Sequence, residues 1–152
     1  MSTELPLVER AMQRFVANLA SCFPDIVYRN KPRPAELAKG TRLLVVLDGD
    51  ILRPADGQLV ARSSYTKIAT VEGYLGIDLA AGEDAGESLH RFYGEVVEAV
   101  RANPVLEGTV FQIIEQDTIL DMDRDNGSLT IGFATDYALY YRTALDSARQ
   151  AA

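Results

Sequence analysis

The chain has little of the residue types that most often carry catalysis or cross-links. Cys22 and His90 are the only cysteine and the only histidine among 152 residues, and tryptophan is absent. A single cysteine excludes an intramolecular disulfide, as is typical of proteins from a reducing compartment. No catalytic constellation is apparent from these residue types.

Long apolar runs are missing as well. The longest, Leu43 to Leu47, has five residues, whereas a membrane-spanning helix needs roughly 20. Near the start of the chain, Glu4 stands where a signal peptide would carry positive charge. We therefore expect no membrane-spanning segment, no export signal and a cytosolic origin.

Basic residues are outnumbered by acidic ones. Fifteen Lys and Arg stand against 22 Asp and Glu, which leaves a formal net charge of −7. General nucleic-acid and anionic-membrane surfaces are rich in Lys and Arg, so neither is expected as a partner of this chain. The 47% of hydrophobic residues and the length are those of one folded domain with a sizeable core.

Two segments show the 3.6-residue period of an amphipathic helix. The first runs from about Thr3 to Leu19, with Ser2 or Thr3 available as the cap. The second runs from Glu83 to Ala102 and is ended by Asn103-Pro104. Its apolar stripe consists of Leu89, Phe92, Tyr93, Val96, Val97 and Val100. We predict that this stripe packs the helix against a sheet.

The remaining regular segments have the composition of strands. Strands are predicted at 26–28, 43–47, 62–77, 110–120 and 129–141. The 43–47 segment is apolar throughout, which predicts that both of its faces are covered. Turn chemistry is present in Pro54 to Gly57 and in Asn126-Gly127, the pair that favours a type I′ hairpin.

Because the strands come in runs, they can pair as antiparallel neighbours. The predicted fold class is α+β, with a mostly antiparallel sheet and two helices packed on one face. Residues 1–143 are predicted to form a single α+β domain, and residues 144–152 a frayed C-terminal tail.

Four positions resemble functional sites only superficially. The run from Asp121 to Gly127 imitates the start of a calcium loop, but the twelfth position is Gly132 instead of glutamate, so a solvated hairpin tip is predicted. Asp48-Gly49-Asp50 fits a turn better than an acid–base pair. His90 is predicted to be a surface residue, and Cys22 a buried or half-buried thiol.

The charges are segregated along the chain. One segment carries five basic residues against Glu36 alone: Arg29, Lys31, Arg33, Lys39 and Arg42. Another carries five acids against Arg124 alone: Glu115, Asp117, Asp121, Asp123 and Asp125. Two solvated loops, or pairing of the two within one chain, would explain this pattern. The alternative is a head-to-tail contact between copies. The hypothesised subunit interface then consists of Arg29, Lys31, Arg33, Asp121, Asp123 and Asp125.

Several short motifs resemble those of a known family. They are Ile26-Val27-Tyr28-Arg29-Asn30, Pro32-Arg33-Pro34, Leu47-Asp48-Gly49-Asp50, Val71-Glu72-Gly73-Tyr74, the helical segment from Leu89 to Tyr93, and Tyr140-Tyr141-Arg142-Thr143. Together they are similar to the tail-completion proteins of tailed bacteriophages and prophages, of the tail terminator or minor tail protein U-like class. The similarity extends from about residue 26 to residue 143.

This resemblance implies an α+β subunit that assembles as a ring, usually a hexamer, capping the tail tube and joining it to the neck. The implied partners are further copies of the chain, the tail tube protein and the neck or connector protein, with no membrane and no specific nucleic acid. The implied location is the tail of the virion, after assembly in the host bacterial cytoplasm. The family has no catalytic residues to carry over, and no cofactor or metal is expected.

Two other functions remain open from the residues alone. One is a different head-tail connector protein of the same kind of particle. The other is a small stand-alone α+β enzyme or ligand-binding domain that uses Asp48, Asp50 and Glu72 in a cleft at the sheet edge.

Overall fold

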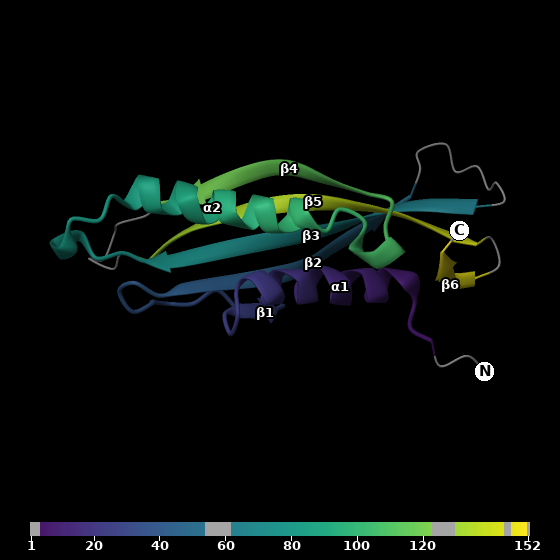
Figure 1. The fold of residues 1–152 in the computed structure, drawn as a ribbon, viewed down its shortest axis with the longest axis horizontal. Coiled ribbons are helices and arrows are strands. Elements are labelled where there is room, and N and C mark those ends of the chain that lie inside the picture. The colour runs from purple at the N-terminus through teal and green to yellow at the C-terminus, as the bar shows by residue number, and fades with distance from the viewer. Residues whose placement is uncertain (1–3, 54–61, 123–129, 145–146, 152) are drawn as a thin grey trace.

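A computed structural model describes residues 4–53, 62–122, 130–144 and 147–151. Its helices and strands are, in chain order, α1 (Leu7–Cys22), β1 (Val27–Arg29), β2 (Arg42–Leu52), β3 (Arg62–Gly76), α2 (Ala85–Ala102), β4 (Gln112–Asp121), β5 (Thr130–Ala144) and β6 (Ser147–Ala151). Two short 3-10 turns lie at Leu79–Ala81 and Leu106–Gly108. The predicted α+β class is confirmed, with both helices on one face of the sheet (Figure 1).

The sheet has the strand order β1-β2-β3-β5-β4, and β6 pairs with the end of β5. β1 is parallel to β2, and all other pairs are antiparallel. β3 and β5 pair over their whole length, from Arg62 opposite Ala144 to Gly76 opposite Thr130. The centre of the sheet is therefore built from strands that are far apart in sequence.

α1 begins later than predicted because Pro6 precedes it in an extended conformation (φ −52°, ψ 147°). The helix also runs past Leu19 to Cys22, since the Phe23 N–H still bonds to the Leu19 carbonyl. The Phe23 side chain enters the core, whereas Cys22 is exposed. The prediction of a buried or half-buried thiol was wrong, because Phe23 fills the position beneath the end of the helix.

α2 lies within two residues of its predicted bounds. The Asp84 side chain accepts a hydrogen bond from the Glu87 N–H and caps the first turn. Leu89, Phe92 and Val96 are buried, as the apolar stripe predicted. The helix ends at Ala102, and Asn103 follows it as the cap, immediately before Pro104.

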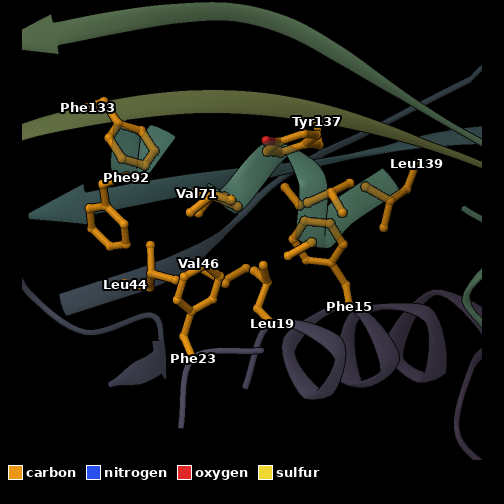
Figure 2. Close-up of a cluster of buried hydrophobic side chains, with 14 of the residues drawn as sticks. Phe15, Leu19, Phe23, Leu44, Val46, Val71, Phe92, Phe133, Tyr137 and Leu139 are labelled. Atoms are coloured by element: carbon orange, nitrogen blue, oxygen red, sulfur yellow. The ribbon is translucent and has the colours of Figure 1, made fainter. Parts of the chain in front are cut away.

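One core fills the space between the helices and the sheet (Figure 2). Phe92 of α2 packs edge-on against Phe133 of β5, with ring centroids 5.5 Å apart. Phe15 of α1 lies 5.8 Å from Tyr137 of β5. Aromatic rings at these separations stabilise a core beyond the area that they bury. The two helices run in opposite directions across the sheet, α1 on the β1 side and α2 on the β5 side (Figure 1).

The C-terminal end of the chain adds a short strand to the sheet. Residues 147–151, predicted to fray, form β6 and pair with β5 at Thr143 and Ala144. The two predicted turns, at 54–57 and 126–127, lie outside the described residues.

Candidate functional site

The segment between β1 and β2 crosses the face of the sheet that is turned away from the helices. Leu37 of this segment packs with Leu43, Val45 and Tyr74, and its N–H donates to the Thr130 hydroxyl over 2.9 Å. Leu43 and Val45 are buried for this reason, although they point away from the helices. We call residues 30–41 the crossing loop.

Arg33 joins the crossing loop to the far edge of the sheet. Its guanidinium lies 5.6 Å from the centre of the Tyr74 ring and forms an ion pair with Asp121 at the end of β4. The hydrogen bond from Arg33 to Asp121 raises the pKa of Arg33. The two residues are 88 positions apart in sequence. At this point the basic and acidic segments pair within one chain, which is one of the alternatives that the sequence left open.

Arg29 is held inside the same chain on the opposite face. It donates two hydrogen bonds to Glu9 of α1, of 2.7 and 2.8 Å, and two to Asp48 of β2, of 2.8 and 3.0 Å. Asn30 adds a 2.8 Å bond to Asp48, and the ammonium of Lys67 lies 3.2 Å from it. Lys67 is itself buried and donates to the Gly49 carbonyl. We call Glu9, Arg29, Asp48 and Lys67 the ionic network.

Within the ionic network, hydrogen bonds keep Asp48 ionised and Arg29 protonated. Hydrogen bonds from Arg29, followed by those from Asn30 and Lys67, hold the pKa of Asp48 far below its usual range. The bonds to Glu9 and Asp48 raise the pKa of Arg29. A carboxylate held in this way stays ionised and accepts hydrogen bonds, so Asp48 is a structural anion and a poor general acid.

The other basic residues of the charge-rich segment also have contacts within the chain. Arg42 pairs with Glu95 of α2 over 2.5 Å, and Lys39 lies 3.6 Å from Asp78. Lys31 lies over the Tyr28 ring, 3.9 Å from its centre. Because Lys31 makes no ion pair with a described residue, it has a charge available to a neighbour.

The acids of the hypothesised interface are described only in part. Asp121 pairs with Arg33, whereas Asp123 and Asp125 lie outside the described residues. Arg29, Arg33 and Asp121 therefore have partners in their own chain. Contact of Lys31 with Asp123 and Asp125 of another copy stays a prediction.

The three carboxylates of the alternative enzyme do not form one site. Asp48 lies on the helix face of the sheet, in the ionic network. Glu72 points to the opposite face, beside Tyr74, whose pKa is raised to about 12 by burial and by the Glu72 charge. A sheet separates the two groups, so they cannot act with Asp50 in a single cleft.

The edge formed by β4 was not predicted as a site, and it exposes large apolar side chains. Ile119 is 72% exposed, and Phe111, Ile114 and Leu120 are also exposed. No described strand pairs with the outer side of β4. The apolar residues of this strand come as two adjacent pairs, Ile113-Ile114 and Ile119-Leu120, and only the strand order shows that the strand lies at an edge.

The remaining candidates have ordinary surroundings. His90 is exposed on α2, as predicted. Within the described ranges, no group of three His, Cys, Asp or Glu is placed to hold a metal ion, and most of the calcium-like run lies outside them. No described helix is long and apolar enough to cross a membrane.

Comparison with known proteins adds no assignment: no protein-family model matches the chain, and no curated protein matches it significantly.

Proposed function

We propose that the chain is a structural subunit of a phage or prophage tail. In this proposal it is a tail terminator or tail-completion protein that assembles as a hexameric ring, caps the tail tube and joins it to the neck. It acts as a building block and not as an enzyme. The short motifs between residues 26 and 143 suggest this function, and the exposed edge of β4 supports it.

The edge of β4 is the observation on which the proposal depends. The unpaired N–H and C=O groups of an edge strand can pair with a strand of another chain, so proteins usually cover edge strands or place charges on them. β4 instead exposes Ile114, Ile119 and Leu120 beside its acidic residues. A surface of this kind is expected where a neighbouring subunit covers it.

The charge of Lys31 offers a second contact for the ring. Its ammonium lies over Tyr28 of the edge strand β1, and β1 and β4 form opposite edges of the sheet. A head-to-tail contact joins two different surfaces of neighbouring subunits, and its repetition forms a ring when the rotation between subunits closes. The β1 side of one subunit would then meet the β4 side of the next.

The test uses native mass spectrometry and negative-stain electron microscopy. The purified chain is examined alone and with tail tubes polymerised from the tube protein of the same gene cluster. We expect hexamers, or rings seated at the tube ends. The proposal is contradicted if the chain stays monomeric and does not bind to the tubes. Rings that bind the neck protein but not the tubes would identify a different connector.

A matched pair of variants locates the contact. Ile119→Lys places a charge on the β4 edge and should abolish rings without unfolding the subunit. Leu79→Lys changes a side chain that is also exposed, at 47%, in the turn before α2. It should leave the rings intact. Equal loss of rings in both variants would place the interface elsewhere.

A further inference from the structure

A pocket of about 390 Å³ lies between the C-terminal end of α2 and β4. Its apolar wall consists of Val97, Val100, Pro104 and Ile113, and Tyr137 of β5 lines it from within the sheet. The pocket forms here because Pro104 ends α2 and the chain turns away before it enters β4. Its volume is within the range of small-molecule sites.

Tyr137 lines this pocket, and the charges of Glu115 and Arg101 act on its hydroxyl. The residue is 1% exposed, and its hydroxyl has no hydrogen-bond partner among the described residues. Most buried polar groups in proteins are hydrogen-bonded, because a lost bond to water is costly when nothing replaces it. Burial, together with the nearby charge of Glu115, raises the pKa of Tyr137, so the hydroxyl stays neutral and can donate.

Two charged side chains line the same pocket. Glu115 of β4 accepts the hydrogen bond of the Tyr93 hydroxyl, with O···O distances of 3.0 and 2.8 Å, and keeps acceptor capacity for a further donor. Arg101 of α2 is exposed and makes no ion pair with a described residue. The pocket thus combines a neutral donor, an anionic acceptor, an exposed cation and apolar walls.

We propose that this pocket binds a small molecule with a compact apolar group and a carboxamide. The carbonyl oxygen accepts from the Tyr137 hydroxyl, the amide N–H donates to Glu115, and the apolar group lies against Val97 and Ile113. Glu115 is half-buried and repels a carboxylate, whereas Arg101 is exposed and its attraction for an anion is screened by solvent. An ammonium leaves the Tyr137 donor without an acceptor. The inference does not depend on the proposed function in a phage tail.

The test is a ligand titration of the protein, monitored by the methyl NMR signals of Val97, Val100 and Ile113. The probes are benzamide, benzoate and benzylamine, which share one ring and differ only in the polar group. We expect saturable shifts with benzamide, with a dissociation constant on the order of 1 mM for so small a ligand. Benzoate and benzylamine should bind about tenfold more weakly.

Three variants decide whether the polar groups act as proposed. Tyr137→Phe keeps the ring and removes the donor, and it should weaken benzamide about tenfold. Glu115→Gln should weaken benzamide and strengthen benzoate, because the repelling charge is gone. Tyr74→Phe, on the other face of the sheet, is the control and should change neither probe. Thermal unfolding of each variant separates loss of binding from loss of folding.

Other outcomes overturn the proposal. Absence of saturable shifts means that the pocket holds water alone. Equal affinity of the parent and of a folded Tyr137→Phe variant means that the hydroxyl takes no part. Tighter binding of benzoate than of benzamide by the parent protein assigns the pocket to an anion bound by Arg101.

Discussion

Arg29 and Asp48 are 19 residues apart in sequence and share two hydrogen bonds, from the Arg29 Nε and Nη2 atoms to the two oxygens of Asp48. This contact connects β1 to β2, and the two bonds from Arg29 to Glu9 connect the same strand to α1. A single guanidinium thus joins the edge of the sheet to the helix layer. Paired, charge-assisted hydrogen bonds of this kind are roughly twice as strong as neutral ones.

The ionic network predicts how stability depends on pH. The pKa of Asp48 is lower in the folded chain than the value of about 3.9 for an unfolded aspartate. Its contribution to the free energy of unfolding is therefore fully present above pH 5. It is lost as the pH falls through about 4 toward the depressed folded value. Urea titrations between pH 3 and 7 measure this loss.

Asp48→Asn is the variant that isolates this effect. At pH 7 it should lower the free energy of unfolding by about 1–3 kcal/mol, because Arg29 and Lys67 lose a charged acceptor. It should also flatten the decline in stability between pH 5 and 3. Asp50→Asn is the control and should leave the slope unchanged. Identical slopes for the parent and Asp48→Asn would contradict the prediction.

Phe92 is predicted to be a main support of the helix layer. It is 1% exposed and packs edge-on against both Phe23 and Phe133. Phe92→Ala should cost about 3–5 kcal/mol in a denaturant titration, because it removes a fully buried ring. Phe111→Ala removes a ring that is 43% exposed and should cost much less. A cost below about 1 kcal/mol for Phe92→Ala would show that the ring adds little to the core.

The ion pair of Arg33 and Asp121 predicts an energetic coupling within the subunit. Arg33→Glu and Asp121→Arg should each lower the free energy of unfolding, and the double reversal should restore it. Both side chains are substantially exposed, so we expect a coupling of about 0.2–1 kcal/mol from a double-mutant cycle. The coupling should shrink in 1 M salt, where the Debye length is about 3 Å. Strict additivity of the two single reversals would mean that the pair does not form in solution.

Lys31, Asp123 and Asp125 predict a coupling between subunits. Lys31→Glu should weaken assembly, and adding Asp123→Lys and Asp125→Lys should restore part of it. Sedimentation velocity at several concentrations measures the assembly, and urea titration checks that each subunit stays folded. Two results would contradict this contact. Either Lys31→Glu and the two acidic reversals each assemble as well as the parent, or the combined variant assembles no better than the weaker of them. In both cases Lys31 of one subunit does not contact Asp123 and Asp125 of the next.

The sequence alone determined the class of the fold and most of its elements. Periodicity is a local property, so the apolar stripe of Leu89, Phe92 and Val96 was sufficient to predict α2 and its buried face. The long strand β3 was predicted from its content of Tyr, Thr, Ile and Val, and only its second half has a clearly apolar side. The charge segregation was also visible in the sequence, although its meaning was not.

Only the tertiary structure decided which of those elements pair and which residues they bring into contact. The pairing of β3 with β5 and the parallel addition of β1 depend on contacts between distant residues, which no local pattern specifies. The partner of Arg33 lies 88 residues away because the crossing loop spans the sheet. For the same reason, the edge position of Ile119 and the burial of the Tyr137 hydroxyl cannot be read from neighbours in sequence. Burial and pairing follow from which segments are adjacent in space, and packing of the whole chain sets that adjacency.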